Sequence, residues 1–367
     1  MKVLQWCRAN AMPVIAVLAA AVTAVFVPPD SAYLGYYDVK TLSCLFCILA
    51  VVCALRGAGL FPLLAQRLVR AFHTARSAVT ALVVVTLIGS MLLTNDTALL
   101  TFLPLSWFVL EGTGQTKHTA LTFILQNCAA NLGGMLTPFG NPQNLYLFNH
   151  YTIPNGEFLT IMLPPFLLST ALILACCLLI SRETLTVPAQ ETPVDKRRCI
   201  VYGVLFCTAA AMVLRGIPYW LGLAAITAAL LVLDRRALLG VDWGLLVTFA
   251  AFFTFSGNMA RIEPVRTLFR QLLAHGAMPV AALTSQVISN VPAAILLSQF
   301  TDDYPALLVG VNIGGAGTLV ASLASLITFR EYTKHVKGQT GRFLALFSAV
   351  SFGFLAVLLA AMTFLTQ

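Results

Sequence analysis

Long apolar runs separated by short polar segments dominate the chain. A run of about 20 apolar residues is long enough to cross the core of a bilayer as a helix. We therefore predict membrane-spanning helices over residues 11–27, 41–58, 119–134, 158–180, 199–214, 217–233, 241–258 and 343–364. The first run is interpreted as a retained span, because Pro28 and Pro29 follow it in place of a small-residue cleavage site.

Two other apolar runs are interrupted by short polar groups. The run 78–110 contains Thr-Asn-Asp-Thr at 94–97, and Asp96 is its only charged residue. The run 278–300 contains Ser-Asn-Val-Pro at 289–292. A carboxylate at the bilayer centre costs roughly 2.5–3.5 kcal/mol on insertion scales, so it is expected to face a cavity or a partner. We predict that each run is a re-entrant hairpin with its polar group at the tip.

Two further runs begin as helices and then become rich in Gly, Pro, Ser and Asn. We predict broken transmembrane helices over 119–152 and 303–333, with irregular segments at 133–144 and 314–325. Irregular backbone at membrane depth is tolerated only where it is buried in protein or lines a water-filled cavity. These segments are therefore expected to lie beside the hairpin tips.

The two halves of the chain resemble each other in sequence. Asn-Leu-Gly-Gly-Met-Leu-Thr at 131–137 aligns without gaps with Asn-Ile-Gly-Gly-Ala-Gly-Thr at 312–318, and Asp38 matches Asp242. The expected topology runs the matched elements in opposite directions, as in the inverted repeats of many secondary transporters. The predicted units are a first repeat over 1–180, a cytoplasmic linker over 181–198, and an extra span with the second repeat over 199–367.

The composition places the chain in a membrane. Of its 367 residues, 59% are hydrophobic and 10% are charged, whereas soluble domains carry about 25% charged residues. The fold class is therefore an all-α polytopic membrane protein of the inner or plasma membrane. The net charge of +8 comes from segments between helices, so we predict no nucleic-acid partner. If the hairpins are re-entrant, the positive-inside rule places the N-terminus in the cytoplasm and the C-terminus outside.

The hairpin tips and irregular segments supply the candidate site. Half-helix N-termini present positive dipole ends to an anion, and freed carbonyls and hydroxyls can hold a cation. The predicted substrate-binding residues are Thr94, Asn95, Thr97, Asn141, Asn144, Ser289, Asn290, Ser322 and Ser325. The predicted ion-coupling residues are Asp96, Asn95, Thr137, Asn290 and Thr318.

Asp96 has two roles open to it. It could coordinate sodium as an anion or carry a proton in coupled transport, and the structural alternative is that it caps the second half-helix of the hairpin. The only cofactor predicted is a coupling ion, Na⁺ or H⁺. No metal cluster is predicted. Cys44 and Cys47 form a CxxC pair inside an apolar run, which favours core packing. No P-loop, GxSxG or HExxH motif occurs, so we predict a transporter and not an enzyme.

At these motifs the chain resembles the ion transporter superfamily, which includes arsenite permeases (ArsB), NhaD-type sodium–proton antiporters and divalent-anion/sodium symporters. The Asn-Asp pair at 95–96 is similar to the first-hairpin motif of the arsenite permeases, and Ser-Asn at 289–290 to the second. The resemblance is greatest to the anion permease branch of the arsenite-permease-like group. It implies an elevator-type motion and a homodimer. The dicarboxylate symporters carry Ser-Asn-Thr at both tips, and this chain differs from them at both.

These observations predict a secondary active transporter for a small, anionic solute or oxyanion, coupled to Na⁺ or H⁺ by alternating access. One alternative is a Na⁺/H⁺ antiporter in which Asp96 is the ion site. A second alternative is a passive anion channel. The motifs do not distinguish Na⁺ from H⁺ coupling or symport from antiport.

Overall fold

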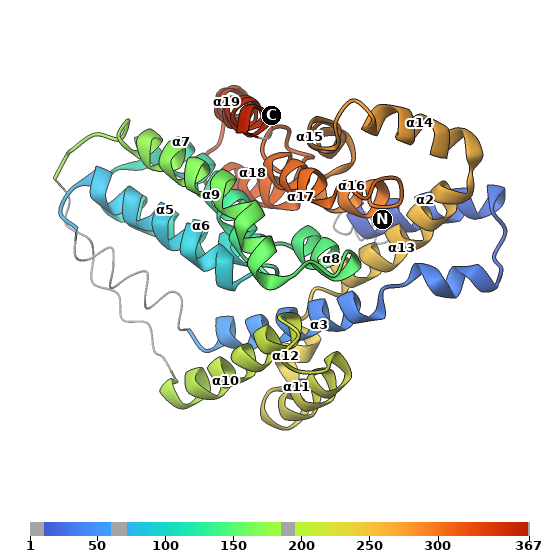
Figure 1. Ribbon diagram of the computed structural model, residues 1–367. Helices are drawn as coiled ribbons and strands as arrows, with labels where there is room; N and C mark the ends of the chain where they lie inside the picture. Colours follow the sequence, from blue (N-terminus) through green and yellow to red (C-terminus); the bar gives the residue numbers. More distant parts are fainter. Residues whose placement is uncertain (1–10, 60–71, 185–194, 366–367) are drawn as a thin grey trace.

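A computed structural model describes residues 11–59, 72–184 and 195–365, and all regular elements in these ranges are helices apart from one isolated bridge between Thr74 and Thr184 (Figure 1). The helices are α2 (Ala11–Phe26), η1 (Ser31–Tyr36), α3 (Val39–Gly57), α5 (Ala75–Leu92), α6 (Asn95–Gly112), η2 (Thr116–His118), α7 (Thr119–Gly133), η3 (Gly134–Leu136), α8 (Pro142–His150), α9 (Asn155–Cys177), α10 (Lys196–Val213), α11 (Tyr219–Leu233), α12 (Arg235–Leu239), α13 (Trp243–Arg261), α14 (Glu263–Leu273), α15 (Ala277–Ile288), α16 (Asn290–Leu297), α17 (Tyr304–Ile313), α18 (Leu323–His335) and α19 (Thr340–Leu365).

Each predicted span overlaps a helix, which confirms the all-α class. Among the described residues, five helices are long and apolar enough to cross a membrane, namely α3, α5, α9, α13 and α19. Helices α2 and α11 are shorter but equally apolar. Helix α10 begins at Lys196, inside the predicted linker 181–198, and the Asp195 carboxylate accepts from the backbone nitrogens of Arg197 and Arg198 in its first turn. Residues 185–194 of that linker lie outside the described residues.

Helices α5 and α6 form a pair that doubles back on itself. They pack against each other, and both outer ends reach the same segment: the Ala75 nitrogen donates to the Glu183 carbonyl at 2.8 Å, and Lys117, just after α6, pairs with the Glu183 carboxylate. The connection is Leu93–Thr94, so the predicted break at 94–97 is displaced. Asn, Asp and Thr are common at the start of a helix, and Asn95, Asp96 and Thr97 form the first turn of α6.

Helices α15 and α16 form a second, shorter pair. Ser289 alone interrupts the helices, with φ at +75°, so the predicted break at 289–292 is too long. Pro292 lies in the first turn of α16, where a missing N–H leaves no hydrogen bond unmade. The segment after α16 lies against the α8–α9 connection, because Tyr151 Oη donates to the Thr301 carbonyl at 2.6 Å.

The two broken helices are present and are interrupted where Gly residues begin. Helix α7 ends at Gly133 and α8 begins at Pro142, while α17 ends at Ile313 and α18 begins at Leu323. The predicted irregular segments, 133–144 and 314–325, therefore run three residues too far at their C-terminal ends. Pro142 begins a helix and does not break one, because proline is favoured at the first helical position.

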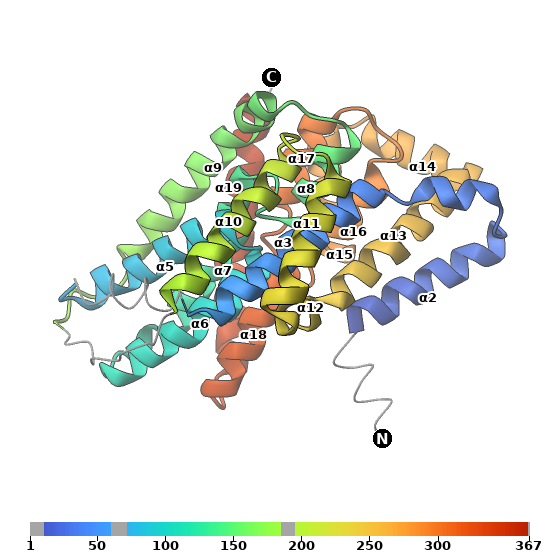
Figure 2. The ribbon, with the colours of Figure 1, turned by 90° about the horizontal axis from the view of Figure 1, so that it is seen from below.

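Helices of one half pack on helices of the other. Figures 1 and 2 show α2 lying along α13, and α10 and α11 lying along α3. The connections within the two helix pairs, Leu93–Thr94 and Ser289, are buried, and the connection 134–141 is mostly buried. The fold thus brings two polar tips and two irregular segments into an apolar core.

Candidate solute and ion site

Matching asparagines start the second helix of each pair. Asn95 and Asn290 are 4% and 3% exposed. Each side-chain Oδ1 accepts a hydrogen bond from the next backbone nitrogen, that of Asp96 in one case and Val291 in the other, both at 2.9 Å. The amides therefore satisfy one of the free N–H groups that every helix start exposes.

Each tip is also tied to the irregular segment of its own half. The backbone nitrogen of Asn95 donates to the Gly140 carbonyl at 3.2 Å, and that of Asn290 donates to the Ala321 carbonyl at 2.9 Å. In the register of the sequence repeat, Gly140 and Ala321 are equivalent positions. The same bond is therefore made in both halves.

Two threonines repeat this pattern with their side chains. Thr137 Oγ1 donates to the Met91 carbonyl at 2.7 Å, and Thr318 Oγ1 donates to the Gln286 carbonyl at 2.9 Å. Both were predicted to couple ions. Their hydroxyl protons hold the irregular segments against the helices that lead into the tips.

Amide and hydroxyl groups cross between the halves. Asn141 Nδ2 donates to Asn312 Oδ1 at 3.1 Å, and Ser322 Oγ donates to Asn131 Oδ1 at 2.7 Å. Asn95 Nδ2 also donates to Asn131 Oδ1, at 3.2 Å. Sequence reasoning omitted Asn131 and Asn312 from the site, although their position as matched amides at the start of the aligned motifs was a usable signal.

Two other predicted substrate ligands, Asn144 and Ser325, are hydrogen-bonded to protein groups. Asn144 is fully buried, donates to the Met135 carbonyl at 3.1 Å and accepts from Asn312 Nδ2 at 2.5 Å. Ser325 Oγ accepts from Asn127 Nδ2 at 3.2 Å. Both side chains are committed to other protein groups.

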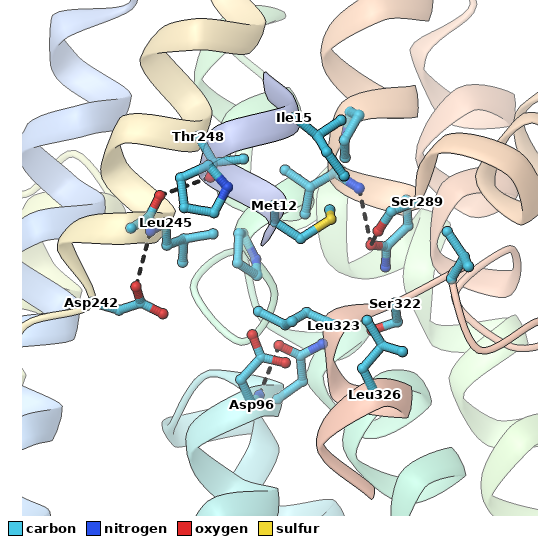
Figure 3. Close-up of a pocket in the computed structure, with 18 of the residues that line it drawn as sticks. Met12, Ile15, Asp96, Asp242, Leu245, Thr248, Ser289, Ser322, Leu323 and Leu326 are labelled. Carbon is cyan, nitrogen blue, oxygen red and sulfur yellow. Dashed lines mark hydrogen bonds between the residues drawn. The ribbon is translucent and has the colours of Figure 1, made fainter. Parts of the chain in front are cut away.

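A pocket of about 330 Å³ opens beside the tips, and we call it the Asp96 pocket (Figure 3). It brings together five predicted residues: Asn95, Asp96, Ser289, Asn290 and Ser322. The predicted residues outside its lining are Thr94, Thr97, Thr137, Asn141, Asn144, Thr318 and Ser325. Of these, Thr94 and Thr97 hydrogen-bond to each other at 2.9 Å.

The pocket carries charges of both signs. Asp96 Oδ1 is buried and has no hydrogen-bond partner among the described residues, so the helix-cap role considered for Asp96 falls to the Asn95 amide. Asp242 enters from the start of α13, where it accepts from the Leu245 nitrogen at 2.9 Å (Figure 3). The exposed Arg330 lies at the α18 wall. Such a pocket can hold an anion and a cation together.

Asp242, Arg330 and helix α2 also line the pocket and were not predicted. The match between Asp242 and Asp38 was a signal for the first, and an arginine inside a predicted broken helix was a signal for Arg330. Helix α2 supplies Met12 and Ile15, which cover one side of the pocket (Figure 3). Nothing in the local sequence of α2 indicates that contact, because it arises from the packing of α2 on α13.

None of the eight cysteines in the described residues lines the Asp96 pocket. Cys44 and Cys47 are fully buried in the hydrophobic core, in agreement with a packing role. Within residues 11–59, 72–184 and 195–365, no group of three His, Cys, Asp or Glu side chains is arranged to hold a metal ion.

Comparison with known proteins gives the family. Residues 3–304 match the citrate transporter family, CitMHS. The chain is 31% identical over 327 residues to an uncharacterized transporter of Methanocaldococcus jannaschii, covering 88% of each chain. It is 32% identical over 282 residues to the inner membrane protein YbiR of Escherichia coli, covering 74% of each. It is 35% identical over 155 residues to the silicon efflux transporter LSI3 of Oryza sativa, covering 41% of this chain and 31% of the rice protein.

The family match covers residues 3–304, and the first two relatives cover 88% and 74% of the chain. Together with the apolar helices of the fold, it makes the protein an integral membrane protein with a small solute as its substrate. The resemblance to the ion transporter superfamily noted from the tip motifs is confirmed. The chain belongs to the citrate transporter family of membrane transporters.

Proposed function

We propose that the protein is a secondary active transporter that moves a small anion or oxyanion and couples its movement to Na⁺ or H⁺. The observation that carries this proposal is the meeting of both tips, at Asn95 and Asn290, with Asp96 at one pocket. The N-termini of α6 and α16 point positive dipole ends toward a bound anion. The Asp96 carboxylate is the group for the coupling ion.

The recurring hydrogen bonds support two inverted repeats and alternating access. The bonds of Asn95 and Asn290 to their irregular segments are equivalent, and the bonds of Thr137 and Thr318 are equivalent as well. In this proposal the repeats are the units 1–180 and 199–367, and the two re-entrant hairpins enter the bilayer from opposite sides. The hairpins and broken helices move together as an elevator in each subunit of a homodimer.

The predicted orientation assigns the two ends of the molecule to opposite sides of the membrane. Lys117 and Glu183 lie at one end, which we assign to the cytoplasm. Tyr151 and Thr301 lie at the other, together with Arg215, whose guanidinium donates to the Ile153 carbonyl at 2.8 Å.

The name of the rice relative, a silicon efflux transporter, is in line with an oxygen-containing solute.

A Na⁺/H⁺ antiporter is the second candidate. The buried, unpartnered Oδ1 of Asp96 and the presence of Asp242 in the same pocket favour it. In this case no anionic solute is moved. Two carboxylates in one pocket suit competition between Na⁺ and a proton.

Transport by the purified protein in proteoliposomes tests these alternatives. We expect uptake of labelled sulfate, phosphate or citrate above its equilibrium level when a Na⁺ or H⁺ gradient is imposed, and exchange of label when unlabelled solute is trapped inside. Uptake that only equilibrates, without exchange, identifies a channel. Proton release driven by Na⁺, with no other solute present, identifies the antiporter. Either result overturns the proposal.

A further inference from the structure

A second pocket is built on the same three helices as the Asp96 pocket. Its volume is about 330 Å³, and we call it the Asp38 pocket because Asp38, at the start of α3, lines it. Helices α8, α13 and α16 line both pockets, and in each helix the Asp38 pocket begins three to five residues after the Asp96 pocket ends. The pairs are Pro142 and Tyr146, Thr248 and Phe253, and Pro292 and Ile295. This offset is about 5–8 Å along each helix, which is about one turn.

The two pockets lie toward opposite ends of the molecule. Asp242, at the start of α13, lines the Asp96 pocket, whereas Gly257, near the end of the same helix, lines the Asp38 pocket. Gln299, which also lines the Asp38 pocket, comes two positions before Thr301, at the end of the molecule assigned to the outside. Gly35 lies at an open part of this pocket, because an added Cβ there would meet no atom within 4 Å.

A layer of buried side chains separates the two pockets. Phe249 and Phe253 of α13 are 0% and 3% exposed, and their ring centroids are 6.0 Å apart. The ring of Tyr146, from α8, lies 5.5 Å from that of Phe253, and its hydroxyl is hydrogen-bonded to Ser298 Oγ at 2.7 Å. Ile295 of α16 is fully buried at the same level. We call Tyr146, Phe249, Phe253 and Ile295 the barrier layer.

Equivalent positions of the two halves line the two pockets. Asp38 caps α3 and Asp242 caps α13, and each carboxylate accepts from the backbone nitrogen three positions further on, at 2.9 Å. Asn149 and Arg330, which are equivalent in the ungapped register of the repeat, line the Asp38 and Asp96 pockets respectively. In an inverted repeat, equivalent residues lie toward opposite faces of the membrane. The Asp38 pocket is thus the counterpart of the Asp96 pocket on the other face.

We propose that the Asp38 pocket is the second entrance of the solute pathway, and that the barrier layer closes it from the Asp96 pocket in this structure. This assignment rests on the proposed function, since alternating access needs an opening on each side of the membrane. The solute and the coupling ion then pass along α8, α13 and α16, and the barrier layer is the part of the path that has to open.

Reaction of single cysteines from the two sides of the membrane tests the pathway without knowledge of the solute. In a cysteine-free background, Gly35→Cys lies in the Asp38 pocket and Thr248→Cys in the Asp96 pocket. In sealed vesicles of each orientation, an impermeant thiol reagent is expected to reach the two from opposite sides. Reaction of both from the same side overturns the proposal.

The effect of the modification on uptake tests whether the solute uses this entrance. The modified Gly35→Cys variant is expected to lose uptake by about fivefold or more, because the added group fills the entrance. Leu34→Cys is the matched control: Leu34 is 81% exposed and is absent from the lining of both pockets, so its modification should leave uptake unchanged. Full uptake by the modified Gly35→Cys variant overturns the proposal.

Loss of a ring tests the barrier layer. Phe253→Ala is expected to raise the rate at which Thr248→Cys reacts from the side of the Asp38 pocket by about tenfold or more, because it leaves a cavity between the pockets. Phe253→Leu, a smaller change, should raise it less, and melting temperatures check that both variants are folded. Phe255→Ala in the same helix removes a half-buried ring outside both linings and should leave the rate unchanged. An unchanged rate in a folded Phe253→Ala variant overturns the barrier. If no solute is transported at all, the proposed function fails, and the two cysteines still show whether the pockets open on opposite sides.

Discussion

At the scale of single residues, Asp96 is the group on which coupling is expected to depend. Asp96→Asn keeps the shape of the side chain and removes its charge, so the folded protein should remain but gradient-driven accumulation should fall at least tenfold. Uptake in proteoliposomes under Na⁺ and H⁺ gradients, with melting temperature as a check on folding, measures this. Asp302→Asn is the control. Unchanged Na⁺ and pH dependence of uptake in the Asp96→Asn variant would rule out the coupling role.

Asn312 is the residue whose loss is expected to destabilise the site most. Its side chain bonds Asn141 and Gln143 through Oδ1 and Asn144 through Nδ2. Asn312→Leu removes the partner of Gln143 Nε2 and of Asn144 Oδ1 and one of the two acceptors of Asn141 Nδ2, and each buried group left unpaired costs about 1–3 kcal/mol. We expect a clear drop in the free energy of unfolding in denaturant titrations. Asn155→Leu, which removes one exposed amide, should have a much smaller effect; equal effects would contradict the importance of the crossed amides.

At the scale of elements, two glycines allow the broken helices to approach the helix pairs. A Cβ at Gly133 would lie 2.7 Å from the Leu87 carbonyl oxygen, and one at Gly314 would lie 2.8 Å from the side chain of Ser285. Gly133→Ala and Gly314→Ala are therefore expected to lower both the melting temperature and transport. Gly203→Ala in α10 meets no atom within 4 Å and should leave stability equal or raise it by about 0.5–1 kcal/mol. If Gly133→Ala changed neither the melting temperature nor transport, the approach of Gly133 to the Leu87 carbonyl would not be tight.

The elements were more predictable than the directions of their side chains. Apolar runs located every span because the bilayer admits only helices of that length. The breaks were displaced by a few residues, because Asn95 and Pro292 suit the first turn of a helix as well as a loop. Asn141 and Asn144 read alike in sequence, yet the first donates to Asn312 and the second mainly to its own segment. Met12 and Ile15 of α2 reach the pocket through tertiary packing, which no local pattern encodes.

At the scale of the whole molecule, the two ends should face opposite sides of the membrane. In a cysteine-free background, Lys117→Cys is expected to react with an impermeant thiol reagent only from the cytoplasm, and Asp302→Cys only from outside. Both positions are well exposed. Labelling of intact and opened spheroplasts measures this. Reaction of both cysteines from one side would mean that α5 and α6 do not return to the face from which they start.

The hydrogen bonds between the two halves of the chain can form only after both halves have been synthesised. Asn141 and its acceptor Asn312 are 171 positions apart in the chain. At about 5–20 residues per second, synthesis of the intervening chain takes on the order of 10 to 30 s. Throughout that interval the first half is in the membrane with a polar centre that lacks its partners. The nascent chain therefore has to keep water, or a helper protein, beside Asn141 until the ribosome has made the second half.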